Sequence, residues 1–158
     1  MSAQPSRTLL FVCTGNTCRS PMAERLMADR CKQLSGWTFA SAGLFARDGA
    51  PPSELAVKVL QEIGIDLSDH RARLLTAELI DQADVIIALT GTHRDLILET
   101  TPQAAGKTRT LHSYGSEKPH ADVMDPYGGA IDTYRIARDE ISGALNDVLL
   151  AEIHPQTL

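Results

Sequence analysis

The chain has 158 residues, 43% of them hydrophobic and 22% charged, and its 20 acidic and 15 basic side chains give a formal net charge of −5. A chain of this length buries roughly two-thirds of its unfolded surface, so we expect one domain over residues 1–158 without a disulfide framework. This composition excludes a disordered chain, and the acidic balance disfavours nucleic acids and anionic membranes as partners. The apolar run Thr8–Cys13 is too short for a signal peptide or a membrane span, which predicts a cytoplasmic protein.

Short apolar runs alternate with helically spaced apolar residues along the chain. In the first half this pattern predicts a strand at 8–12, a helix at 21–36, a strand at 37–40, a loop at 46–53 and a helix at 55–63. In the second half it predicts a short helix from Thr76, a strand at 84–89, a helix at 93–99, a strand at 109–112, a loop at 113–129 and a helix at 134–148. The alternation indicates an α/β fold with a parallel sheet, whose ligands bind beyond the carboxyl ends of the strands.

One loop follows the first predicted strand and leads into the first predicted helix. It consists of Cys13, Thr14, Gly15, Asn16, Thr17, Cys18 and Arg19. Successive amides in such a loop, together with the helix N-terminus, can cradle an anion, and the Arg19 guanidinium can hold two phosphoryl oxygens. The same groups stabilise a Cys13 thiolate. A thiolate beneath a phosphoryl group is a nucleophile for in-line displacement, which gives a phosphocysteine intermediate.

This reaction also needs a proton donor for the leaving group and a base for the attacking water. The loop holds no carboxylate, so the donor must come from another part of the chain. Asp125, stiffened by Pro126, is the best candidate, and Asp122 is the second. The alternative for Asp125 is a residue that only begins a turn.

Other interpretations of the cysteine loop are weaker. A zinc site needs two more ligands, and no second cysteine pair or close histidine pair supplies them. The glycine-rich patterns GxGxxG and GxxxxGK[ST] of dinucleotide and nucleotide loops are absent. A simple turn leaves Arg19 and both cysteines unexplained. Cys31 lies in an apolar repeat and is expected to be a buried core residue.

The segment CTGNTCRSPMAE, residues 13–24, resembles the phosphate-binding loop of the low-molecular-weight protein-tyrosine phosphatases. The similarity extends to Ser41-Ala-Gly43, to residues 69–73 and 83–86, and to Asp125-Pro-Tyr-Gly128. The resemblance implies a four-stranded parallel sheet flanked by helices on both faces, a flavodoxin-like doubly wound fold, with no metal and no cofactor. It makes Cys13 the nucleophile, Arg19 the phosphate clamp and Asp125 the general acid and then base, with phosphorylated proteins as substrates and inorganic phosphate as product.

The resemblance also implies roles for residues around the loop. It suggests that Asn16, Ser20, Ser41 and His70 form a polar network that supports the loop, although from sequence alone His70 is expected at the surface. It further implies that Cys18 forms a reversible disulfide with Cys13, which protects the nucleophile and switches activity off. The histidines that match no catalytic motif are expected to be ordinary residues: His93, His112, His120 and His154.

Two positions bear on the substrate. Tyrosine-specific members of this family often carry a bulky aliphatic residue where this chain has Thr17, and often two large residues after Asp-Pro. Here Tyr127 is followed by Gly128 and Gly129, a pattern that resembles the bacterial protein-arginine phosphatase branch. We therefore expect phosphoarginine on proteins as the substrate, with phosphotyrosine as the alternative.

The sequence gives less support to two other functions. Arsenate reductases of this fold transfer the oxidation to further cysteines near the middle of the chain, but no cysteine follows Cys31. A non-catalytic phosphoprotein-binding module would be expected to lack either the nucleophile or the acid, and both are present.

Overall fold

The computed structural model describes residues 6–115 and 117–154. Its sheet has four parallel strands, β1 (Arg7–Cys13), β2 (Trp37–Gly43), β3 (Val85–Ala88) and β4 (Thr108–Thr110), in the order β2-β1-β3-β4. The predicted α/β class with a four-stranded parallel sheet is confirmed. β1 lies between β2 and β3, so the loop that follows Cys13 leaves from the middle of the sheet.

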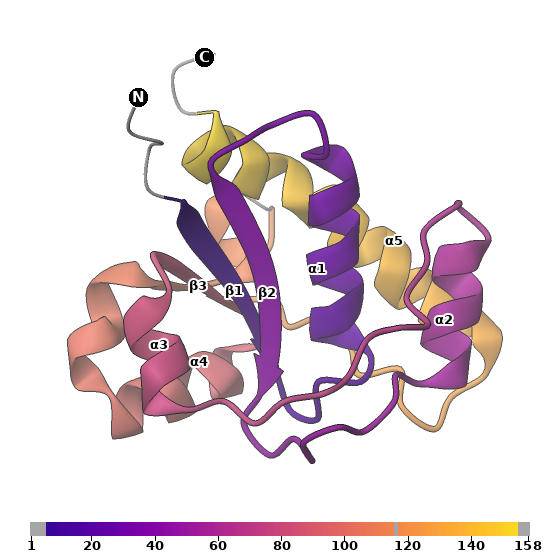
Figure 1. Ribbon diagram of the computed structural model, residues 1–158, viewed down its shortest axis with the longest axis horizontal. Coiled ribbons are helices and arrows are strands. Elements are labelled where there is room, and N and C mark those ends of the chain that lie inside the picture. The colour runs from indigo at the N-terminus through magenta and orange to yellow at the C-terminus, as the bar shows by residue number, and fades with distance from the viewer. Residues whose placement is uncertain (1–5, 116, 155–158) are drawn as a thin grey trace.

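Five α-helices cover the sheet in two layers (Figure 1). The helices are α1 (Arg19–Arg30), α2 (Glu54–Gln61), α3 (Ala77–Gln82), α4 (Gly91–Thr100) and α5 (Ile131–Val148), with shorter turns η1 (Pro102–Lys107), η2 (Leu111–Tyr114) and η3 (Leu149–Ile153). Figure 1 shows α1, α2 and α5 on one side of the strands and α3 and α4 on the other.

Alternate residues of β1 supply the two halves of the core. Leu9 and Phe11 pack in one cluster with residues of α1, α2 and α5, whereas Leu10 and Val12 pack in a second cluster with Ile80 of α3 and Ile97 of α4. Both faces of the strand are therefore buried, as the continuous apolar run predicts.

Several element boundaries differ from the sequence prediction. α1 ends at Arg30, because the apolar residue Leu34 that suggested a longer helix lies in an exposed turn. β4 ends at Thr110, and the predicted strand residues Leu111 and His112 belong to a 3-10 turn that packs on α5. β2 continues to Gly43, so Ser41 lies within the strand instead of in the turn after it.

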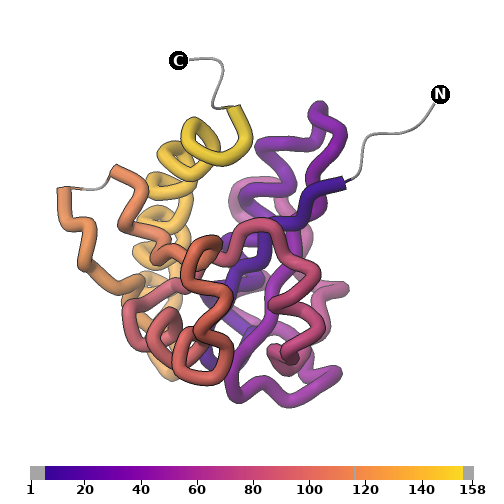
Figure 2. The backbone as a smooth tube through the Cα atoms, turned by 90° about the vertical axis from the view of Figure 1, so that its left-hand side faces the viewer, coloured from indigo at the N-terminus to yellow at the C-terminus, as the bar shows by residue number. Residues whose placement is uncertain are grey.

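The carboxyl ends of the strands meet at one end of the molecule. Figures 1 and 2 show the start of β1 and the end of α5 at the opposite end. The loop after β1, the start of α4 after β3 and the start of α1 therefore share one edge, which is where ligands bind in such folds.

Candidate active site

Residues 14–18 form a tight loop. Backbone amides from the segment after β2 hold carbonyl oxygens of this loop and of Cys13 before it. The amides of Leu44, Phe45 and Ser53 donate to the backbone oxygens of Cys13, Thr14 and Thr17 over 3.0, 2.9 and 3.0 Å. The amides of residues 14–18 donate no hydrogen bond to residues 6–115 or 117–154. These unpaired amides are available to a bound anion.

Asn16 gives the loop its shape. Its φ is 56°, the only positive value outside glycine among the described residues, and buried side chains hold it there. Its Nδ2 donates to Ser20 Oγ and to Ser41 Oγ, each over 2.9 Å, and its Oδ1 accepts from the amide of Arg73 over 3.0 Å. His70 donates from Nε2 to the backbone oxygen of Asn16 over 2.8 Å.

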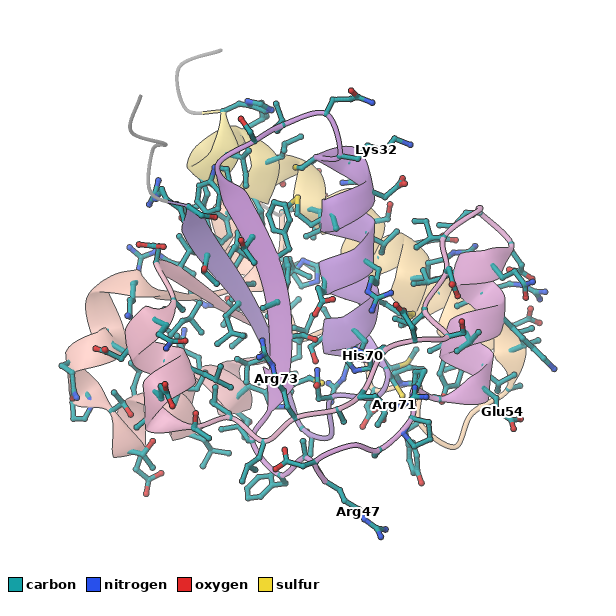
Figure 3. All side chains as sticks on the ribbon, in the orientation of Figure 1. Lys32, Arg47, Glu54, His70, Arg71 and Arg73 are labelled. Atoms are coloured by element: carbon teal, nitrogen blue, oxygen red, sulfur yellow. The ribbon has the colours of Figure 1, made fainter. Side chains whose placement is uncertain are left out.

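The four residues implied to support the loop therefore lie in one hydrogen-bonded network. His70 is buried, so the expectation of a surface histidine from sequence alone is wrong, and burial lowers its pKa. Figure 3 shows His70 at the end of α1 nearest the loop and Arg73 beside the end of β2. Arg73 donates from Nε to the backbone oxygen of Ser41 over 3.0 Å, which ties the segment after His70 to the sheet.

The network continues to a residue that sequence reasoning did not single out. Ser41 donates from Oγ to Glu24 Oε1 over 2.8 Å, and Glu24 pairs through Oε2 with Arg25 Nε at 3.1 Å. Glu24 lies one helical turn beyond Ser20, on the face of α1 that meets β2. Its position in the segment 13–24, which resembles the phosphate-binding loop of a known family, is the sequence feature that could have identified it.

Cys13 lies at the base of the loop. Its side chain is buried, and its Sγ lies 2.8 Å from Ser20 Oγ. Because Ser20 Oγ already accepts from Asn16, its own proton can be donated to a Cys13 thiolate. A Cys13 thiolate therefore has a hydroxyl donor within hydrogen-bond distance.

Arg19 connects the loop to a distant segment. Its guanidinium is buried, and its Nη1 donates to the backbone oxygen of Val123 over 3.0 Å. Its Nη2 lies 3.5 Å from both Thr14 Oγ1 and Asp125 Oδ2. The first residue of α1 therefore reaches the segment that carries the predicted acid.

That segment presents Asp125 at the surface. Its side chain is 53% exposed, and its Oδ1 accepts from the amide of Tyr127 over 3.1 Å. Asp122, the second candidate acid, accepts from the amide of Gly91 over 2.8 Å and so fixes the segment to the start of α4. Asp122 does not line the pocket described next.

A pocket of about 220 Å³ brings these elements together. It is lined by Cys13, Thr14, Gly15, Thr17, Cys18, Arg19, Asp125 and Tyr127. Six of the seven residues of the predicted phosphate-binding loop, the predicted acid and both predicted specificity residues thus share one cavity. Its volume suits a phosphoryl group together with the first atoms of a side chain.

One histidine differs from expectation. His93 was expected to be an ordinary residue, but its ring is buried and its Nε2 lies 2.9 Å from Thr14 Oγ1. Its position four residues after Leu89, just beyond the strongest predicted strand, was a signal, because such residues share the sheet edge with the Cys13 loop. His112, also buried, pairs with Glu140 at 2.9 Å, away from the pocket, and His120 is exposed.

The three cysteines are unpaired. Cys18 is buried, and its Sγ lies 3.7 Å from both Thr17 Oγ1 and Tyr134 Oη. Burial raises the pKa of the Cys18 thiol. Cys31 lies in the main core beside Met27, as expected for a core residue.

The described residues contain no group of three or more histidine, cysteine, aspartate or glutamate side chains placed to hold a metal ion. None of the helices in residues 6–115 and 117–154 is both long and apolar enough to cross a membrane.

Comparison with known proteins places this geometry in a family. The model of the family described as low molecular weight phosphotyrosine protein phosphatase matches residues 8–157. A protein-arginine-phosphatase of Geobacillus stearothermophilus is 48% identical over 133 residues, which cover 84% of this chain and 87% of that protein.

Similar solved structures support the same family assignment. The YwlE arginine phosphatase from Geobacillus stearothermophilus has a TM-score of 0.87 and 42% identity, with 96% of each chain covered. A YwlE cysteine-to-serine mutant with a phosphorylated active site serine has a TM-score of 0.85 and 37% identity, with 92% of this chain and 96% of that chain covered. The chain therefore belongs to the low molecular weight phosphotyrosine protein phosphatase family.

Proposed function

We propose that this protein is a cysteine-dependent phosphatase that removes phosphoryl groups from arginine side chains of proteins. The observation that carries the proposal is the shared pocket of Cys13, Arg19 and Asp125, with the unpaired amides of residues 14–18 around it. The net charge of −5 offers no general attraction for an anion. Binding therefore depends on the local amides and the Arg19 guanidinium.

In the first step, the Cys13 thiolate attacks phosphorus and forms an S–P bond while the P–N bond of phosphoarginine breaks. Asp125 protonates the departing guanidine nitrogen, and Arg19 and the loop amides hold the equatorial oxygens. In the second step, the Asp125 carboxylate takes a proton from water, which attacks phosphorus. The S–P bond breaks, inorganic phosphate leaves, and the Ser20 hydroxyl stabilises the returning thiolate.

The nucleophile is supported by a relative. One similar structure carries a phosphorylated serine in place of the active-site cysteine. A hydroxyl at that position retains the phosphoryl group, as a covalent mechanism requires.

The substrate preference rests on the walls of the pocket. Thr17 presents a short side chain with a hydroxyl, and Tyr127 is the only aromatic side chain among the lining residues. Tyr127 is followed by two glycines, so the pocket offers an aromatic ring of the substrate only one aromatic wall to stack on. The exposed Asp125 carboxylate can contact a guanidinium, and both the similar protein and the similar structure from Geobacillus stearothermophilus are named as arginine phosphatases. Phosphotyrosine is the second candidate because the family model is named for it.

Parallel kinetics on two peptides of one sequence, carrying phosphoarginine or phosphotyrosine, test the proposal. We expect a higher kcat/KM for phosphoarginine, and a shift toward phosphotyrosine in Thr17→Ile of about 10- to 100-fold at most, since a pocket change of one or two methyl groups discriminates weakly. A higher kcat/KM for phosphotyrosine would favour the second candidate, and turnover of neither would remove both. Cys13→Ser is the control: it should lose turnover but still bind phosphate.

We also propose that Cys18 is a redox partner of Cys13. Peroxide oxidises the Cys13 thiolate to a sulfenic acid, and the Cys18 sulfur displaces hydroxide to form the disulfide, which a thiol reductant reopens. Both sulfurs lie in one seven-residue loop, and both are buried. Three unpaired thiols suit a reducing compartment, so we place the protein in the cytoplasm.

Mass spectrometry after mild peroxide should find a Cys13–Cys18 bond, and Cys31→Ser should leave that bond unchanged. A sulfinic acid on Cys13 with Cys18 still free would contradict the redox role.

A further inference from the structure

His93 is a buried residue beside the pocket that the proposed mechanism does not use. It lies in the first turn of α4, and its backbone amide donates to Thr90 Oγ1 over 3.1 Å. Its side chain is 5% exposed, and its Nε2 lies 2.9 Å from the hydroxyl of Thr14. α4 therefore places an imidazole directly behind a pocket-lining side chain 79 residues away.

The Thr14 hydroxyl contacts two nitrogen groups. The Nη2 of Arg19 lies 3.5 Å from Thr14 Oγ1, in addition to the His93 Nε2 at 2.9 Å. A guanidinium can only donate hydrogen bonds, so Thr14 Oγ1 is the acceptor in that contact. What the hydroxyl proton does then depends on which nitrogen of His93 carries a proton.

The imidazole is neutral at physiological pH. Burial and the positive charge of Arg19 lower the pKa of His93 to about 4, against smaller opposing effects of Asp122 and Asp125. A neutral ring carries its proton on either Nδ1 or Nε2.

The surroundings of Nδ1 select between these tautomers. Nδ1 is buried and has no hydrogen-bond partner in residues 6–115 and 117–154. A proton there would leave a buried N–H unpaired, which is rarer and costlier than a buried acceptor left unpaired. The proton therefore lies on Nε2, which donates to Thr14 Oγ1.

We propose that His93 is a positioning residue that makes the Thr14 hydroxyl a donor to the phosphoryl group in the pocket. Both lone pairs of Thr14 Oγ1 accept from protein, one from His93 and one from Arg19, so its own proton is left for the pocket. The inference rests on the proposed function in one respect, because it takes the phosphoryl group as the pocket's occupant.

Three variants test it. Thr14→Val keeps the shape but removes the hydroxyl, His93→Leu removes the donor to Thr14, and His93→Gln keeps an N–H at the end of a side chain of similar reach. In Thr14→Val and His93→Leu, we expect the inhibition constant of inorganic phosphate to rise about 10-fold, the value of one hydrogen bond to an anion. The double variant should bind phosphate no more weakly than Thr14→Val alone, because His93 acts on the phosphate only through the Thr14 hydroxyl. His93→Gln should recover most of the loss, and His120→Leu, which alters an exposed histidine, should bind phosphate normally.

Nitrogen NMR of the wild-type protein gives a readout that does not depend on the variants folding. We expect His93 Nε2 to be protonated and Nδ1 to be unprotonated, and the reverse tautomer would overturn the proposal. Additive effects in the double variant, or normal phosphate inhibition in a folded His93→Leu protein, would also overturn it. If the wild-type protein neither hydrolyses phosphorylated peptides nor binds phosphate, the proposed function fails instead.

Discussion

The lining of the pocket comes from two segments, residues 13–20, called the floor, and residues 122–129, called the rim, which differ in burial and in hydrogen bonding. On the floor, Cys13, Asn16, Arg19 and Ser20 are buried. Ser41 of β2 and His70 hold Asn16, and His93 of α4 contacts Thr14. On the rim, the Asp125 side chain is 53% exposed and Tyr127 is 77% exposed. In the proposed mechanism, the groups that meet the phosphoryl oxygens belong to the hydrogen-bonded floor, whereas the groups that meet the leaving group face solvent.

The largest expected effect is a loss of activity without a loss of stability when the rim residue Asp125 is replaced. Asp125→Asn should lower kcat for phosphoarginine by about 10²- to 10⁴-fold, the usual contribution of a general acid. Its urea unfolding midpoint should hardly change, because the side chain is exposed and its ion pair with Arg19 is long. Asp132→Asn, at another exposed carboxylate, is the matched control. An unchanged kcat in Asp125→Asn would remove the residue from the mechanism.

The second prediction concerns the floor, where activity and stability should fall together. A Cβ on Gly43 would lie 2.6 Å from Thr14 O and 2.9 Å from Asn16 N, so the loop backbone must move in Gly43→Ala. We expect stability to drop by about 1–3 kcal/mol and kcat/KM to drop about 10²-fold, since small displacements of a catalytic loop are costly.

Chemical unfolding and kinetics on the same preparations measure both effects. Gly143→Ala, where a Cβ meets nothing within 4 Å, serves as the control. A fully active Gly43→Ala protein would mean that the floor tolerates movement.

The smallest expected effect is a decrease in folding stability at acidic pH, caused by His93 beside the floor. His93 titrates near 4 when folded and near its ordinary value of 6.5 when unfolded. The unfolded chain therefore binds more protons as the pH falls below 6.5, and stability decreases in the same direction. Between about pH 7 and pH 5, His93 alone should cost about 2 kcal/mol.

Urea unfolding at the two pH values tests this, with His93→Gln expected to lose less stability on acidification. His70, whose pKa is also lowered by burial, adds to the effect in both proteins. An identical pH dependence in the two proteins would contradict the buried, neutral state of His93.

How far the sequence predicts this molecule depends on whether the relevant residues are close in the chain. The floor is contiguous, so its chemistry can be derived from residues 13–19, and the apolar run before it predicts a central strand. The position of His93 after a predicted strand suggests a place near the loop, but its contact with Thr14 and the Ser53–Tyr134 hydrogen bond of 2.9 Å cannot be derived from the sequence, because they span 79 and 81 residues. The end of β4 was misplaced because buried Leu111 has the same pattern in a 3-10 turn as in a strand.

The rim is attached to the floor through main-chain atoms. The carbonyl of Val123 accepts from Arg19, and its amide donates to the carbonyl of Leu89 at the end of β3. Such an anchor does not depend on which side chains follow, so the exposed residue Tyr127 can be exchanged while the hydrogen bond between Arg19 and Val123 is kept. We therefore expect substitutions of Tyr127 to change which phosphorylated side chain the pocket accepts, while Cys13, Arg19 and Asp125 stay in place.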